Sequence, residues 1–114
     1  MTDEQLIELL TIAHEMGADG EVRYKNSTGQ LHRMHGPAVI YADGTEFWYQ
    51  RDKFHRIDGP AVIMPSGSQF WYQMDKLHRI DGPAKILFDG KCQWYLDGIP
   101  YPREVWELRR VATP

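Results

Sequence analysis

The amino-acid sequence predicts a mainly β protein of the α+β class. Antiparallel β-hairpin repeats form one twisted sheet, with an N-terminal helix and a short C-terminal helix at its ends. Three observations predict this fold. The phrase His-Arg-x-x-Gly-Pro-Ala occurs three times at an interval of 23 residues. Between these phrases, Pro and Gly interrupt any helix, and β-branched and aromatic residues fill the runs between them. The two ends of the chain instead carry apolar residues at helical spacing.

The repeat extends well beyond the shared phrase. Units 32–54 and 55–77 share 14 of 23 residues, and units 55–77 and 78–100 share 11. A glycine turn and a Trp-Tyr pair recur in register, and a partial unit precedes them at residues 18–24. Self-similarity at a fixed period is the signature of a repeat architecture, in which each unit packs on its neighbours. The array is therefore predicted to be a meander of hairpins.

Each unit is predicted to hold two strands, such as residues 46–50 and 61–64, joined by a glycine turn. Successive side chains of a strand point to opposite faces, so the Trp and Tyr of each pair lie on opposite sides. We expect the invariant isoleucines to share a buried face with the tryptophans, and the alanines to make room for the indole rings. Lys85 occupies the position of Val39 and Val62 in the other units. This lysine predicts that the valine face of the sheet is more exposed to water than the isoleucine face. The predicted buried ladder contains Trp48, Trp71, Trp94, Ile40, Ile63, Ile86, Ala38, Ala61 and Ala84.

Both ends of the chain are predicted to be helical caps. Residues 2–16 begin with a possible capping box at Thr2 and Gln5 and carry an apolar stripe, and Gly17 suits a helix stop. Residues 102–111 open with Pro102, which is tolerated in a first helical turn. The predicted organisation is an N-terminal helix at 1–17, a repeat sheet at 18–101, and a helical cap and tail at 102–114.

Length, net charge and cysteine content limit the classes of protein to which this chain can belong. A chain of 114 residues is long enough for one modest domain. A formal charge of −3 gives the whole molecule no attraction for nucleic acid or anionic lipid. Cys92 is the only cysteine, so no internal disulfide is expected, and no signal peptide or membrane span is indicated. We expect a soluble cytoplasmic protein without a membrane partner.

The string DGTEFWYQRDKFHRIDGPAVIMPSG at residues 43–67 resembles the membrane occupation and recognition nexus (MORN) repeat. It is still more similar to MORN-like proteins of bacteriophages with HRxDGPA…DGxxxWY repeats, and WYLDGIPYPREVW at 94–106 resembles the way such proteins end. The resemblance covers about residues 18–106. It implies a twisted sheet of hairpins and an interaction role rather than a chemistry. A phage protein of this kind would act in the cytoplasm of its host cell.

The repeated polar residues raise two site hypotheses. A metal site is not expected at His32, His55 and His78, because equivalent positions two strands apart are separated by roughly 10 Å. An anion-binding stripe could form from Arg33, His35, Arg56 and Arg79, since guanidinium matches phosphate. Asp58 and Asp81 follow two of these arginines and favour structural ion pairs instead. No cofactor is expected.

The aromatic residues suggest the most informative surface. The predicted partner-binding residues are Phe47, Tyr49, Phe70, Tyr72 and Tyr95, which lie on one predicted face. No set of nucleophile, base and orienting residue is evident, so an enzyme is not expected. The predicted function is a small phage-type module that binds a host protein or complex, for example part of a defence system, as an inhibitor or adaptor. The alternatives are a binder of anions, nucleotides or nucleic acid, and a self-assembling homo-oligomer.

Overall fold

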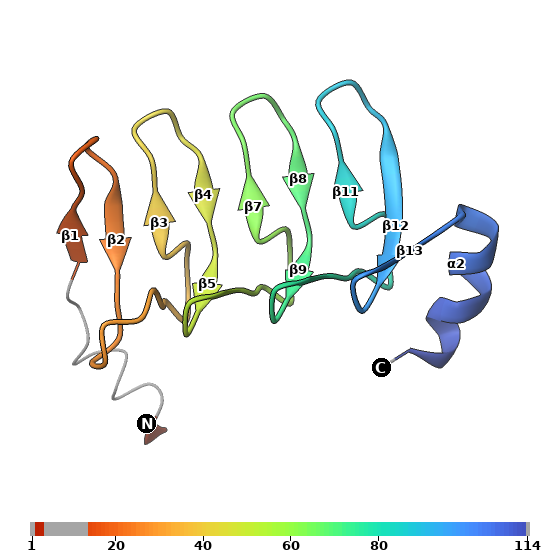
Figure 1. The fold of residues 1–114 in the computed structure, drawn as a ribbon, viewed down its shortest axis with the longest axis horizontal. Helices are drawn as coiled ribbons and strands as arrows, with labels where there is room; N and C mark the ends of the chain where they lie inside the picture. Colours follow the sequence, from red (N-terminus) through yellow and green to blue (C-terminus); the bar gives the residue numbers. More distant parts are fainter. Residues whose placement is uncertain (1, 4–13, 114) are drawn as a thin grey trace.

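The protein is described by a computed structural model covering residues 2–3 and 14–113. Hairpins stand side by side along the long axis, and a helix lies at the C-terminal end (Figure 1). Neighbouring strands form one nine-stranded sheet in the order β1-β2-β3-β4-β7-β8-β11-β12-β13. These strands are His14–Met16, Val22–Tyr24, Val39–Ile40, Glu46–Phe47, Val62–Ile63, Gln69–Phe70, Lys85–Ile86, Cys92–Leu96 and Ile99–Tyr101.

The pairing is antiparallel throughout this sheet, in a constant register. Phe47 of β4 lies opposite Val39 of β3 and Val62 of β7, and Phe70 of β8 again lies opposite Val62. The chain ends in helix α2, Arg103–Arg109, followed by a 3₁₀ turn, Arg110–Ala112. The prediction of a mainly β fold with a short C-terminal helix is confirmed. None of the described helices is long and apolar enough to cross a membrane.

The predicted N-terminal helix is wrong at its C-terminal end. His14–Met16 forms β1 and pairs with β2, so that His14 lies opposite Tyr24 and Met16 opposite Val22. The turn between them is closed by a hydrogen bond from Gly17 N to Glu21 O. The backbone of β2 gains hydrogen-bond partners from this strand, which helical propensity alone did not reveal. Residues 4–13 of the predicted helix lie outside the described residues.

The strands predicted at 46–50 and at its equivalent in the next unit are broken at their tryptophans, whereas β12, Cys92–Leu96, runs unbroken through Trp94. After Trp48 the chain forms β5, Tyr49–Gln50, which pairs with β6, Lys53–Phe54, as a separate two-stranded sheet. The next unit repeats this with β9, Tyr72–Gln73, and β10, Lys76–Leu77. The predicted single hairpin per unit is therefore an upper hairpin and a smaller lower one, which Figure 1 shows along the lower border of the array.

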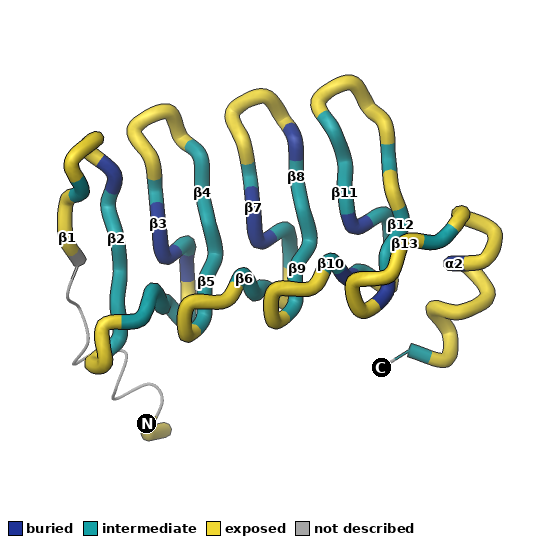
Figure 2. Tube along the Cα trace, in the orientation of Figure 1, coloured by how far each residue is buried: buried dark blue, intermediate teal, exposed yellow. Residues whose placement is uncertain are grey.

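The predicted buried face is also corrected. Val39 and Val62 are only 3% and 5% exposed, whereas Ile40, Ile63 and Ile86 are half-buried. The lower hairpins fold toward the valine side, where the Phe54 ring lies 5.4 Å from the Phe47 ring. The buried segments recur at the same level of successive hairpins (Figure 2). Ala38, Ala61 and Ala84 are fully buried, as the sequence predicts, and Trp48, Trp71 and Trp94 are half-buried.

The arginine of each repeated phrase covers the aromatic ring that precedes it. The Arg56 guanidinium lies 3.7 Å over the Trp48 ring, donates from Nε to Asp58 at 2.9 Å, and donates from Nη1 to Pro60 O at 3.2 Å. A Cβ on Gly59 would come within 2.8 Å of this guanidinium, so a side chain there would force Arg56 away from its place over Trp48. Arg79 repeats the arrangement over Trp71.

The histidine of each phrase joins the start of its unit to the lower turn of the same unit. Nδ1 of His32, His55 and His78 accepts a hydrogen bond from a backbone N–H that lies 19 residues later. The donors are Arg51, Met74 and Asp97, which open the lower turns and have positive φ angles of 49°, 49° and 50°. This conformation is unfavourable for residues with side chains. The histidine therefore helps to hold a strained turn of its own unit.

Replacing Gly59 with Ala should destabilise the protein by about 1–3 kcal/mol, because the methyl group displaces the Arg56 guanidinium. Urea unfolding of Gly59→Ala, Arg56→Ala and the double variant measures the coupling. With Arg56 already removed, the glycine substitution should cost much less. Equal costs in both backgrounds would contradict this packing role.

Acid should weaken the bond that His55 accepts. Burial lowers the pKa of His55 below its ordinary 6.5, which favours the neutral ring that accepts from Met74 N. Its contribution to stability is thus present above the unfolded pKa and is lost as the pH falls below it. Thermal unfolding between pH 7.5 and 5 should show a smaller loss for His55→Asn, whose side-chain oxygen accepts without titrating. An identical pH dependence in both proteins would contradict this expectation.

Candidate binding surfaces

One continuous row of rings crosses from repeat to repeat, and we call it the aromatic surface. The Tyr49 and Phe54 rings stack 4.4 Å apart, and Phe54 stacks on Tyr72 of the next repeat at 5.1 Å. Phe47 lies at one end of the row, with its ring 6.2 Å from that of Tyr49. All members are half-buried, so each ring is packed on one side and still accessible. The aromatic surface comprises Phe47, Tyr49, Phe54, Phe70, Tyr72 and Tyr95.

Lys85 extends the aromatic surface toward the C-terminal end. Its ammonium group lies 5.9 Å from the centre of the Phe70 ring and 5.6 Å from that of Tyr95. The residue occupies the position of the buried Val39 and Val62, and its stem can cover apolar area while its charge reaches solvent. Lysine at this position therefore does not indicate a wet face, which explains the incorrect sequence prediction.

The structure brings the predicted partner-binding residues onto this one side of the sheet and adds Phe54. Phe54 links the rings of two repeats, yet sequence reasoning missed it. Its counterparts are Leu31 and Leu77, so a single aromatic residue at this position carried no repeated signal. Recognition of the lower hairpin would have placed it opposite Tyr49, its partner in the β5–β6 ladder.

The environment of the aromatic surface perturbs two of its tyrosines. Burial raises the pKa of Tyr49, and the charges of Tyr41, Asp75 and Asp52 add to this effect. Burial likewise raises the pKa of Tyr72, with smaller contributions from Tyr95 and Asp75. Both directions favour the neutral phenol, which can donate a hydrogen bond to a partner.

The residues of the hypothetical anion-binding stripe lie on the tryptophan side. Arg56 and Arg79 are each engaged by a ring, a carboxylate and a carbonyl, as described above. Arg33 lies 4.0 Å over the Tyr24 ring and donates to Pro37 O at 3.2 Å. His35 replaces the aspartate of the other copies, so Arg33 has no ion pair with any described residue. The side chain of His35 is exposed.

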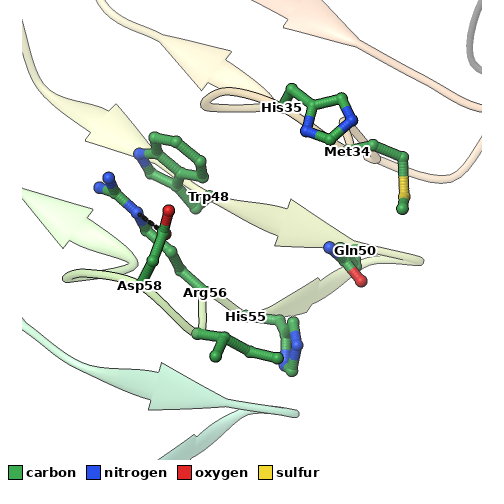
Figure 3. A pocket seen from close by; sticks show the side chains of 8 residues that line it. Met34, His35, Trp48, Gln50, His55, Arg56 and Asp58 are labelled. Atoms are coloured by element: carbon green, nitrogen blue, oxygen red, sulfur yellow. Dashed lines mark hydrogen bonds and ion pairs between the residues drawn. The ribbon is translucent and has the colours of Figure 1, made fainter.

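Grooves separate the loops of successive phrases on the tryptophan side. The first, of about 640 Å³, lies over Trp48 between Met34 and His35 on one side and the loop of Arg56 to Asp58 on the other (Figure 3). The second, of about 480 Å³, lies over Trp71 between residues 57–60 and 78–81. The lining residues of these two grooves correspond at the 23-residue interval.

Within the described part of the chain, no group of three or more His, Cys, Asp or Glu could hold a metal ion. Comparisons with protein-family models, curated proteins and solved structures found no match for this chain.

Packing should shift the ionisation of the tyrosines in the aromatic surface to higher pH. In an alkaline titration followed by phenolate absorbance, the contribution of Tyr72, isolated as wild type minus Tyr72→Phe, should appear at higher pH in the folded protein than in denaturant. The phenol returns to water on unfolding, so its pKa falls back toward its ordinary value. Coincident curves for the folded and denatured proteins would show that the ring is not desolvated.

Proposed function

We propose that this chain is a protein-binding module that covers a surface of a host protein or complex and so acts as an inhibitor or adaptor. The observation that carries the proposal is the continuous, half-buried row of rings from Phe47 through Tyr49 and Phe54 to Tyr72. Aromatic side chains offer large contact areas with few rotatable bonds, and they are enriched where protein interfaces gain most of their affinity.

Charge favours a protein over a nucleic acid as the partner. Single-strand binders combine stacking rings with a positively charged groove along the backbone. Here Asp52 and Asp75 lie close enough to the aromatic surface to raise the pKa of Tyr49. The arginines Arg56 and Arg79 lie on the other side and are bonded within their own loops. Among the described cation–ring contacts, Lys85 is the one cation on the aromatic surface, at Phe70 and Tyr95, and one lysine does not make the positive groove that a phosphate backbone requires.

The resemblance to MORN-like phage proteins supports the cellular location that we propose for this module. A module of this kind would act in the cytoplasm of a host cell, where a defence complex is one suitable target. Fold resemblance supports an interaction role but does not identify the partner, so the residues of the aromatic surface carry the argument.

A pull-down from bacterial lysate tests the proposal with Tyr72→Ala as the key variant. Wild type should retain a specific host protein, and Tyr72→Ala should lose it at least tenfold, since hot-spot truncations cost roughly 2 kcal/mol or more. Phe88→Ala is the matched control, because Phe88 is 74% exposed and belongs to an upper turn outside the aromatic surface.

Equal retention by wild type and Tyr72→Ala would overturn the assignment of this surface. Short oligonucleotides provide the competing arm. Binding that weakens steeply with salt and is unaffected by Tyr72→Ala would instead indicate phosphate contacts elsewhere on the molecule.

A further inference from the structure

Two departures from the 23-residue repeat meet in one pocket. The pocket has a volume of about 440 Å³, which lies within the range of small-molecule sites. It shares Met34 and Gln50 with the groove of Figure 3. Side chains of the first lower turn, residues 26–30, line it together with Arg51 and Met74 from the next two lower turns. The length of the first turn and the arginine are both absent from the other units.

The first lower turn is held in one shape by its own polar side chains. It spans residues 26–30, one residue more than the equivalent turn at 50–53. Oδ1 of Asn26 accepts from Thr28 N at 3.1 Å and from Gln30 N at 3.0 Å, and Nδ2 of Asn26 donates to Oε1 of Gln30 at 2.9 Å. Because this oxygen is used within the turn, the Gln30 amide offers its nitrogen to a ligand, and no described residue accepts from it.

Arg51 gives the pocket its charge. It is the one arginine or lysine in the lining, and no aspartate or glutamate lines the pocket within the described part of the chain. The Arg51 side chain is exposed and makes no hydrogen bond, ion pair or ring contact with a described residue, unlike the arginines of the repeated phrase. Asp52, the next residue, accepts from Leu31 N at 2.7 Å and is outside the lining.

His32 adds a neutral donor. Its Nδ1 accepts from the backbone N of Arg51 at 3.2 Å, so the proton of the neutral ring lies on Nε2. No described residue accepts from that N–H. Gln30, His32 and Arg51 therefore bring donors without acceptors to a pocket that has no carboxylate in its described lining. Phosphate oxygens fit such a set, because they accept from guanidinium in pairs and from further N–H groups.

The rest of the lining suits an organic group. The side chains of Met34 and Met74 line the same pocket, and thioether side chains adapt their shape and make favourable contacts with rings. A volume of about 440 Å³ is also far larger than a phosphate ion requires. The pocket therefore has room for the molecule to which a phosphate is attached.

We propose that this pocket binds a phosphate monoester of a small organic molecule, of the nucleotide or sugar phosphate type. The phosphate accepts from Arg51, His32 and Gln30, and the organic part packs against Met34 and Met74. None of the lining residues belongs to the aromatic surface. The site is therefore separate from the proposed protein-binding function, and the pull-down with Tyr72→Ala does not depend on it.

Methionine methyl signals in nuclear magnetic resonance spectra of the full-length protein report the site. Met34 and Met74 line the pocket, and Met64 beside an upper turn is an internal reference, 38% exposed. Adenosine monophosphate and a ribose phosphate distinguish the two types of ester. Both should shift the Met34 and Met74 signals saturably and leave the Met64 signal in place. Inorganic phosphate should bind more weakly, and adenosine should give no saturable shift.

Arg51→Met is the key variant. Met74 occupies the equivalent turn position with the same φ of 49°, so methionine is compatible with this backbone and the variant should fold. Loss of the charged hydrogen bonds should weaken binding of both esters at least tenfold. Lys91→Met is the matched control, because it removes the same charge from an upper turn, where the Lys91 side chain is 80% exposed. This control should bind as wild type does.

Three results would each overturn the proposal. The first is the absence of a saturable shift at Met34 and Met74 with both esters. The second is equal affinity of wild type and Arg51→Met, or of adenosine and its monophosphate, since either would show that the phosphate is not recognised. The third is inorganic phosphate binding as tightly as both esters, which would show that the methionines contact no organic group.

Discussion

The stacking of an arginine on the aromatic ring before it is the interaction on which this fold depends. A single sheet needs a cover for its apolar face, and the described residues supply no second layer over the tryptophan side beyond α2 at its C-terminal end. The Arg56 guanidinium lies 3.7 Å over Trp48, and its donors are used by Asp58 and Pro60. The Arg56 side chain therefore shields the Trp48 ring from water, and its own charge is held in place by its hydrogen bonds. This arrangement explains the glycine at position 59, because a side chain there would meet the Arg56 guanidinium.

The repeated phrase is thus explained by neighbouring contacts rather than by catalysis. Its histidine bonds the lower turn of its own unit, its arginine covers a ring of the preceding unit, and its alanine is fully buried. Each unit buries few large side chains, because no large side chain among the described residues is fully buried. Stability must then come from interfaces between units, as in other repeat arrays. At the C-terminal end Trp106 supplies the cover that the missing next phrase would have provided.

The features that recur at the 23-residue interval could be predicted from the sequence, and the features outside this pattern could not. The antiparallel hairpins and α2 follow from glycine turns, proline positions and apolar spacing. The lower hairpins were missed because Arg51 and Asp52 adopt left-handed φ angles of 49° and 65° without a glycine to signal the turn. The buried valine face was misassigned because the amphipathic stem of Lys85 was read as a solvent marker. Phe54 completes the aromatic surface through pairing that only the lower hairpin creates.

The two candidate surfaces differ in how they connect to stability. A partner on the aromatic surface contacts rings that already stack on one another, so it adds contact area without disturbing the arginines. A group in the groove over Trp71 would instead meet the Arg79 guanidinium, which already lies 3.9 Å over that ring. Displacing this cation would uncover the ring and break a contact between two repeats. Occupation of the Trp71 ring and the integrity of the array therefore oppose each other.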